Sequence, residues 1–326
     1  ATAATAPAPS TAEAQPLNAA PLQSSTQAAI QALTLANAAV VGVNVKATDN
    51  AQSVQTLGKD RRGSGVVIDA SGLILTIGYL MLEAEQVSII TQDNKVLPAR
   101  AVAYDLATGF GLLQPLLPLR VAPVKLGSYN DVQESEPLMA STGGGDGDVA
   151  MTQLVSKRKF SGYWEYHIEQ ALFTSPPINN HSGAPLFNRK GELVGIGSLL
   201  VMDATGQNAR LPGNMFVSVD LLKPILGELQ EKGSSTASKR PWLGVTSAEQ
   251  GGRVQIVRVS KDGPAQAAGI RPGDFVLGVD GAAVTSLEAF YKAVWSRAAP
   301  DAQVKLTVLQ GSELKTIVLQ PVDRQS

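Results

Sequence analysis

Residues 178–186 read Ile-Asn-Asn-His-Ser-Gly-Ala-Pro-Leu and place Ser182 in a tight turn that a glycine follows. Residues 187–196 continue with the end of a short apolar strand, a polar turn and a second apolar strand. A nucleophilic side chain needs this presentation, with its oxygen lifted off the backbone and free N–H groups beside it. The stretch therefore predicts a β-rich fold with Ser182 at the position of a nucleophile.

Composition limits the classes of protein to which this chain can belong. Its 326 residues are 44% hydrophobic and 17% charged, which is the balance of a globular protein with about two domains. The net charge of −1 gives no general attraction for nucleic acid, and we expect no nucleic-acid partner. No apolar run approaches the roughly 18 residues of a membrane span, so we expect no such span.

Cysteine and histidine usage limits the chemistry further. The chain has no cysteine, which excludes disulfides, thiolate nucleophiles and cysteine-ligated zinc. Its two histidines are His167 and His181, so a histidine-based catalytic or metal site must use these. Asp146 and Asp148 could contact a cation, but in a glycine-rich stretch we interpret them as a polar turn. We expect no metal and no cofactor.

Residues 1–26 are rich in Ala, Pro, Ser, Thr and Gln and contain one charge, Glu13. Such a segment buries little apolar surface, and we predict a disordered lead. The chain opens without an initiator Met and without a signal peptide. We expect that a targeting segment was removed or that the chain was trimmed.

The next 200 residues contain many short strands separated by turn residues. A helical pattern at 26–36 precedes them, and an amphipathic helix at 220–232 follows and stops at Gly233. This rhythm is typical of an all-β sandwich or a pair of barrels. The expected strands are 39–45, 63–69, 73–76, 87–91, 96–104, 111–113, 136–141, 150–155, 163–173, 193–202 and 215–219.

A second compact unit follows residues 233–239, whose Gly, Ser and Thr content predicts a flexible linker. Strands are expected at 254–259 and 275–279, a short helix at 265–268, and a closing hairpin at 304–319. Ser286 caps a helix at 286–295, which Glu288 and Lys292 stabilise as an i,i+4 pair. Leu287, Phe290 and Val294 are expected on its inner face.

Two stretches resemble parts of one protein family. Residues 63–69 and 72–76, together with the serine segment, resemble the trypsin-fold domain of HtrA/DegP-type serine proteases. Residues 262–276 resemble part of an HtrA-type PDZ domain. The resemblance implies a mostly β fold, with a double β-barrel trypsin-like domain over 27–232 followed by one PDZ domain over 240–323.

The resemblance also implies a damaged catalytic triad. The family has a His where this chain has Tyr79, and an Asp where it has Gly109. Ser182 keeps the nucleophile position, while Asn180 and His181 occupy the oxyanion-hole positions that are usually Gly and Asn. A tyrosine is a weak general base at neutral pH and a glycine has no side chain to orient one.

Replacement catalytic groups have plainer interpretations. His181 could act as a base, but side chains of adjacent residues usually diverge, and we interpret it as a turn residue. His167 lies in a predicted strand, and we interpret it as a strand-face residue. Asp105 lies four residues before Gly109, which predicts a role in the turn rather than in the triad.

The PDZ-like unit keeps an intact candidate site. PDZ domains add a peptide strand to a sheet edge and bind its terminal carboxylate on backbone N–H groups. The resemblance places that loop at Trp242, Leu243, Gly244 and Val245, with Tyr291 on the helix beside the groove. The expected partners are protein or peptide C-termini.

These observations favour a catalytically inactive HtrA-like pseudoprotease of the cell envelope that acts as a peptide- or protein-binding scaffold, chaperone-like surface or regulatory factor. The alternative is a weakly active or partner-activated serine endopeptidase that uses Ser182. A third possibility is a structural subunit of a larger assembly. The family implies a periplasmic or otherwise exported location, and a homotrimer or a stable envelope partner.

Overall fold

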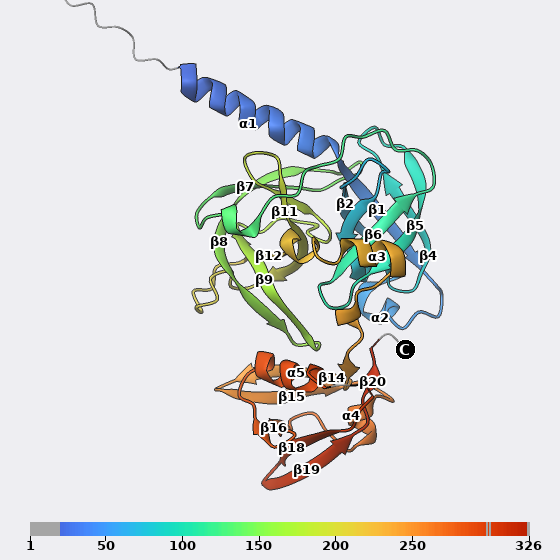
Figure 1. Ribbon diagram of the computed structural model, residues 1–326, viewed down its shortest axis with the longest axis vertical. Helices are drawn as coiled ribbons and strands as arrows, with labels where there is room; N and C mark the ends of the chain where they lie inside the picture. Colours follow the sequence, from blue (N-terminus) through green and yellow to red (C-terminus); the bar gives the residue numbers. More distant parts are fainter. Residues whose placement is uncertain (1–19, 298, 300, 325–326) are drawn as a thin grey trace, which may run out of the picture.

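The computed structural model describes residues 20–297, 299 and 301–324 (Figure 1). The predicted disordered lead falls outside these residues up to position 19. Its remaining part, residues 20–26, belongs to the helix α1 (Ala20–Ala38), so the prediction of disorder is wrong there. Pro21 is tolerated because it lies in the first turn of the helix, where its missing N–H would have no partner within the helix.

Two closed barrels of antiparallel strands form the first unit (Figure 1). In the first barrel the strand order is β1-β2-β3-β6-β5-β4, and in the second it is β10-β11-β12-β9-β8-β7. Apolar side chains that alternate along the strands point inward; one cluster of buried residues extends across both barrels, and a second, smaller one lies within the second barrel. The first barrel contains β1 (Val40–Ala47), β2 (Asp60–Val67), β3 (Ile74–Ile77), β4 (Ala84–Ile90), β5 (Val96–Tyr104) and β6 (Phe110–Pro115).

The second barrel contains the serine segment and a long hairpin. Its strands are β7 (Pro137–Ser141), β8 (Val149–Gly162), β9 (Tyr166–Ser175), β10 (Pro185–Phe187), β11 (Leu193–Val201) and β12 (Gly213–Ser218). The predicted strand 163–173 begins three residues later than expected, because residues 163–165 form the turn between β8 and β9. Short helices connect the strands of the two barrels: α2 (Val54–Leu57), η1 (Gly78–Met81) and η2 (Tyr129–Asp131).

The segment that leaves the second barrel is docked rather than flexible. The predicted helix 220–232 is split into η3 (Val219–Leu221) and α3 (Leu226–Lys232), with Pro224 between them. In the predicted flexible linker, η4 (Thr236–Ser238) follows Ser235, and the side chains of Ser235 and Ser238 are buried. Both hydroxyls donate to Asp105, which is itself fully buried. Asp105 therefore anchors the connection between the domains.

The second unit is a partly open sheet with two helices. Its strands pair in the order β14-β15-β16-β18-β19, with β17 beside β16 and a separate pair of β13 and β20. Leu287, Phe290 and Val294 are buried in its core and Ser286 Oγ caps α5, as predicted. The elements are β13 (Pro241–Trp242), β14 (Val245–Gln250), β15 (Arg253–Val259), α4 (Pro264–Ala267), β16 (Phe275–Val279), β17 (Ala282–Ala283), α5 (Leu287–Trp295), β18 (Val304–Gln310), β19 (Glu313–Leu319) and β20 (Val322–Asp323).

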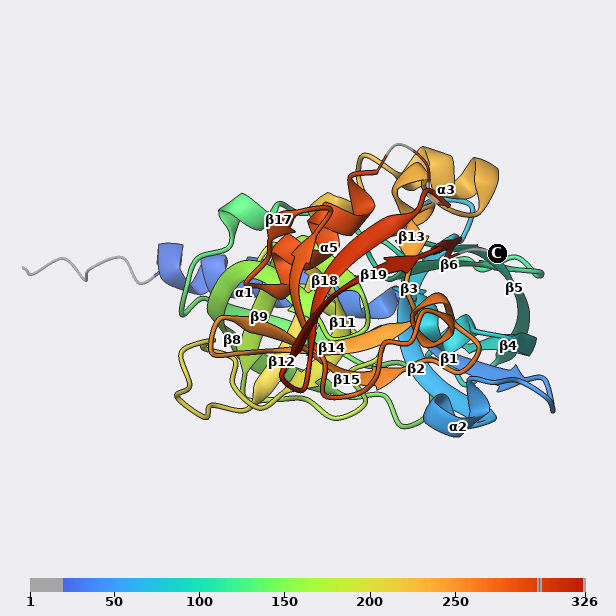
Figure 2. The same cartoon turned by 90° about the horizontal axis from the view of Figure 1, so that it is seen from below.

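The β8–β9 hairpin and α5 bring the first unit into contact with the second unit (Figures 1 and 2). Lys292 pairs with Glu169 on β9 at 2.9 Å and with Glu288 on its own helix at 2.8 Å. Lys159 on β8 also reaches Glu288, at 3.1 Å. The predicted pair within α5 is therefore part of an ionic cluster between the domains.

None of the helices over the described residues is both long enough and apolar enough to cross a membrane.

Replacing Asp105 by alanine should weaken both the first unit and the attachment of the linker. The change removes the acceptor for Ser235, for Ser238 and for the Thr108 amide, and leaves their donors unpaired in a buried position. We expect a loss of about 3 kcal/mol, measured by urea unfolding followed by circular dichroism. Asp146→Ala, in an exposed loop, is the matched control. Equal urea midpoints for both variants would contradict the anchoring role.

Candidate functional site

The turn around Ser182 is built by backbone geometry. Asn180 and Gly183 have φ angles of 55° and 75°, in the left-handed region that asparagine tolerates and glycine prefers. The Ala184 amide donates to the His181 carbonyl at 3.0 Å and closes the turn. A Cβ on Gly183 would lie 2.0 Å from the Ser64 carbonyl oxygen, so only glycine fits between the barrels here.

Tyr79 provides the hydrogen-bond partner of the Ser182 hydroxyl. It lies in η1, directly after β3, and its phenol oxygen contacts Ser182 Oγ. The same phenol donates to the Ser198 carbonyl at 3.1 Å. A neutral phenol has a single proton. Because Tyr79 uses that proton in its hydrogen bond to the Ser198 carbonyl, the Ser182 hydroxyl is the donor in its contact with Tyr79. Ser182 is thus held by a weak acceptor.

The protonation state of Tyr79 opposes a role as base. Burial raises its pKa above the ordinary value near 10, and the hydrogen bond to Ser182 only partly offsets this effect. Burial also raises the pKa of neighbouring Tyr104, to about 12. At neutral pH both phenols are protonated and cannot accept a proton from Ser182.

Gly109, which the resemblance places at the position of the orienting carboxylate, has no side chain. It has a φ of 94° in the turn after β5, where its amide donates to the Asp105 carbonyl at 2.7 Å. A Cβ at Gly109 would lie 3.5 Å from the phenol oxygen of Tyr166, which donates to the Thr108 carbonyl. A tyrosine from β9 therefore borders this space, while Asp105 binds the linker.

The two histidines do not replace the missing base. The half-buried His181 ring has its pKa lowered by burial, and the nearby backbone of Ser198 only partly offsets this effect. His167 is 8% exposed on β9, with Nδ1 2.7 Å from Ser161 Oγ and Nε2 3.1 Å from Glu169. Over the part of the chain that the structure describes, Ser182 Oγ makes no hydrogen bond to a histidine or a carboxylate.

Two backbone amides of the serine turn bear on the predicted oxyanion hole: that of Asn180, one of its two expected positions, and that of Ser182 itself. Within the described residues, the N–H groups of Asn180 and Ser182 make no hydrogen bond to another protein group. Free amides of this kind can stabilise a developing negative charge.

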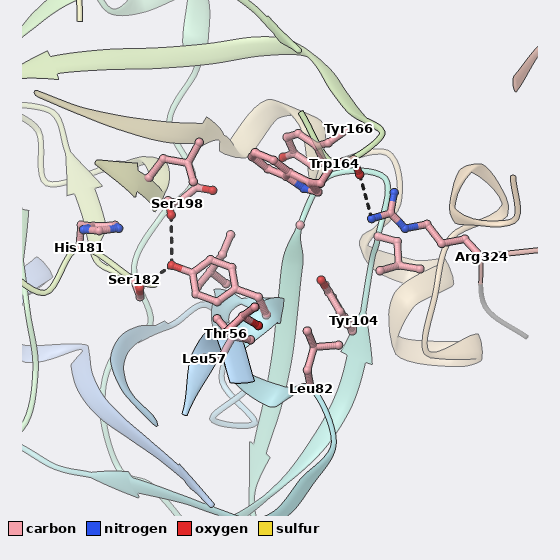
Figure 3. A pocket seen from close by; sticks show the side chains of 15 residues that line it. Thr56, Leu57, Leu82, Tyr104, Trp164, Tyr166, His181, Ser182, Ser198 and Arg324 are labelled. Carbon is pink, nitrogen blue, oxygen red and sulfur yellow. Dashed lines mark hydrogen bonds between the residues drawn. The ribbon is translucent and has the colours of Figure 1, made fainter. Parts of the chain in front are cut away.

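A cavity of about 680 Å³ opens beside Ser182 (Figure 3). His181 and Ser182 lie at one end of it, and Arg324 lies at the other (Figure 3). Its walls are largely aromatic and aliphatic, and the ring of Trp164 stacks on Tyr166 at 5.2 Å between centroids. The lining residues are Thr56, Leu57, Ile77, Tyr79, Leu82, Tyr104, Leu106, Gly109, Trp164, Tyr166, His181, Ser182, Ser198, Leu199 and Arg324.

The expected peptide-binding residues lie together at one edge of the second unit. The amides of Leu243, Gly244 and Val245 converge, directly after Trp242 in β13. Tyr291 is buried on α5, and its hydroxyl donates to the Gly162 carbonyl at 2.5 Å. Tyr291 is therefore in contact with the β8–β9 hairpin of the same chain.

One cluster has donor atoms that a metal ion could use. His167, Glu169 and Glu288 bring one ligand atom each within 4.8 Å of one another. Both carboxylates already pair with Lys292, and Glu288 also pairs with Lys159. The hydrogen bond from Lys292 is the main cause that lowers the pKa of Glu169, to about 2, and the contact with His167 adds to it. The cluster is an ionic contact between the domains.

Sequence reasoning missed Tyr166, Ser198 and Glu165. Tyr166 and Ser198 approach the serine turn only through the closure of the second barrel, and no local motif marks them. Glu165 had a signal, because a lone acidic residue stands within the aromatic run 163–166, which was interpreted as a strand. A turn at this point would have explained why the charge is tolerated.

The comparisons with known proteins agree with this architecture. Residues 63–196 match the model of the trypsin-like peptidase domain, and residues 241–320 match that of the PDZ domain. The DegP-like periplasmic serine endoprotease of Pseudomonas fluorescens is 26% identical over 67% of this chain and 47% of its own length. Serine protease PepD of Mycobacterium tuberculosis is 28% identical over 88% of this chain and 66% of its own length.

Among solved structures, the HtrA-type protease AlgW with a decapeptide matches 91% of this chain and 98% of its own. The TM-score is 0.58 and the identity 19%, a likeness that supports the shared fold. The chain thus spans about half the length of the DegP-like relative and about two thirds of that of PepD.

The backbone at Gly109 predicts an asymmetry between two glycine substitutions. Gly109→Ala places a Cβ on a residue with a φ of 94° and should cost about 1–2 kcal/mol. Gly227→Ala in α3 meets no atom within 4 Å and should stabilise by about 0.5–1 kcal/mol. Calorimetric unfolding measures both changes. Equal effects would show that the Gly109 turn does not require its left-handed conformation.

Proposed function

We propose a binding role without proteolysis for this chain, which is homologous to HtrA- and DegP-type serine proteases and combines a trypsin-like peptidase domain with a PDZ domain. The observation that carries the proposal is the partner of the Ser182 hydroxyl. That partner is the partly buried, neutral phenol of Tyr79. A serine nucleophile needs a base that accepts its proton in the transition state.

The loss of the orienting carboxylate supports the same proposal. A histidine at position 79 alone would find no acid at Gly109 to fix its orientation, because Asp105 is bound to Ser235 and Ser238. Removal of catalytic triad members leaves a residual acceleration of about 10³–10⁴ over water. Such a rate is too low for a working endopeptidase, and we propose that the peptidase domain serves as a scaffold.

The PDZ domain provides the binding function of this proposal. Its convergent amides at Leu243, Gly244 and Val245 have the chemistry that captures carboxylates, and β14 lies beside α5 as the wall of a groove. We propose that protein or peptide C-termini bind there. We further propose a periplasmic or exported location, with a homotrimer or a stable envelope partner as the assembled state; the DegP-like relatives carry periplasmic names.

The reactivity of Ser182 tests the loss of catalysis. The purified chain should resist a fluorophosphonate probe and leave unfolded casein intact, while a DegP-type protease in a parallel reaction is labelled and cleaves. Ser182→Ala should behave like the unmodified chain in both assays. Casein cleavage that disappears in Ser182→Ala would overturn the proposal.

A second candidate function is a weak endopeptidase in which Tyr79 is the base, and the contact between its phenol and Ser182 favours it. The pH profile separates the two functions. The raised pKa of Tyr79 means that its phenolate, the form able to accept a proton, appears only above about pH 10. Cleavage by this route should increase as pH approaches and passes that value, and should vanish in Tyr79→Phe. Cleavage at neutral pH that survives in Tyr79→Phe would contradict a tyrosine base.

A further inference from the structure

The carboxylate-binding loop of the PDZ domain holds a side chain of the same chain. The Glu165 carboxylate accepts the Leu243 amide at 2.8 Å, the Gly244 amide at 3.1 Å and the Val245 amide at 3.3 Å. Glu165 is 3% exposed and lies in the turn between β8 and β9. A buried carboxylate needs compensating donors, and these three amides supply them. The loop therefore binds an internal carboxylate in the way it would bind the end of a peptide.

The backbone of the turn also follows the direction of a bound peptide. The Ser247 amide on β14 donates to the Tyr163 carbonyl at 2.9 Å, two residues before Glu165. Tyr163 therefore lies beside Ser247, and the Glu165 carboxylate lies beside Leu243. As the residue number rises in the turn it falls along the facing segment, so the turn is antiparallel to β14. One strand contact and one terminal carboxylate contact are the two elements by which an added strand binds to a PDZ sheet edge.

The opposite wall of the groove closes over the same turn. Tyr291 on α5 donates to the Gly162 carbonyl at 2.5 Å, and the Glu165 amide donates to the Tyr291 hydroxyl at 3.3 Å. Arg324, outside the groove, donates to the carbonyls of Glu165 at 2.7 Å and of Trp164 at 3.3 Å. The turn is thus held from β14, from α5 and from the end of the described chain.

The conformation of Glu165 indicates that its side chain matters. Its φ of 57° lies in the left-handed region, which is strained for a non-glycine residue. The hydrogen bonds that its carboxylate accepts from three backbone amides offset this strain. A residue with no carboxylate at position 165 would keep the strained backbone conformation and would lack the hydrogen bonds to the three amides.

We propose that residues 162–165 are an intramolecular ligand of the PDZ groove, with Glu165 in the place of a peptide's terminal carboxylate. A peptide with a free C-terminus then binds only when it displaces this turn. The inference rests on the proposed peptide-binding function and names its regulation: apparent affinity is reduced by the fraction of molecules in which the turn is docked.

Amide hydrogen exchange tests the internal ligand without any peptide. Glu165→Gln places an amide group against three N–H donors and should release the turn. We expect exchange of the Leu243, Gly244 and Val245 amides, followed by mass spectrometry of the full chain, to be at least tenfold faster. Glu231→Gln, an exposed glutamate on α3, is the matched control and should leave it unchanged. Equal exchange in both variants would overturn the proposal.

Peptide binding tests the competition. The probe is a fluorescein-labelled peptide that repeats residues 160–164 and ends in alanine with a free carboxylate, and its control carries a C-terminal amide. Fluorescence anisotropy should show at least tenfold tighter binding of the free-acid peptide to Glu165→Gln than to the unmodified chain. Glu165→Gln should bind the amidated peptide at least tenfold more weakly than the free acid. Equal affinity of the free acid for the unmodified chain and for Glu165→Gln would overturn the competition.

Arg324→Ala provides a second variant, because it loosens the turn from outside the groove. We expect the same direction of change in exchange and in affinity, at least threefold. Faster exchange in Glu165→Gln without peptide binding to any variant would support the internal ligand and contradict the peptide-binding part of the proposed function. Circular dichroism confirms that each variant is folded.

Discussion

The turn at Ser182 is fixed between the two barrels by backbone contacts that need no catalytic side chain. The Ser64 amide donates to the Ser182 carbonyl at 2.9 Å, and the Gly183 amide donates to the Gly197 carbonyl at the same distance. The Ser64 carbonyl oxygen lies so close to the Cα of Gly183 that no side chain fits there. These contacts join β2, the serine turn and β11. The geometry of a nucleophile therefore persists for structural reasons, because the packing of the barrels requires this turn whether or not Ser182 reacts.

Around this turn, neutral tyrosines stand where a catalytic site would carry ionisable groups. Tyr79 contacts Ser182, Tyr166 borders the space at Gly109, and Tyr104 lines the same cavity. Burial raises the pKa of all three phenols, so the cavity stays uncharged at neutral pH apart from Arg324 at its far end. Such a lining suits the binding of apolar groups better than it suits proton transfer.

The succession of short strands predicted a sandwich or a pair of barrels, and the family resemblance implied the double barrel and the PDZ domain; the described structure and the domain comparisons confirm both domains. Strand periodicity and turn residues are local signals, and they placed the serine turn and the capped helix α5 correctly. The docked linker was missed, because Ser235 and Ser238 look like any flexible segment until Asp105 approaches from 130 residues away. The roles of Tyr166 and Glu165 were missed for the same reason, since they depend on tertiary contacts.

Trp164 belongs to two sites at once. It forms part of the wall of the cavity beside Ser182, and it lies in the turn whose neighbours Tyr163 and Glu165 bind the PDZ domain. A molecule that fills the cavity therefore contacts a residue whose position depends on the PDZ groove. Thermodynamic reciprocity then applies to the two binding affinities. If a ligand in the groove changes the affinity of the cavity for its own ligand by some factor, the cavity ligand changes the affinity of the groove for its ligand by the same factor.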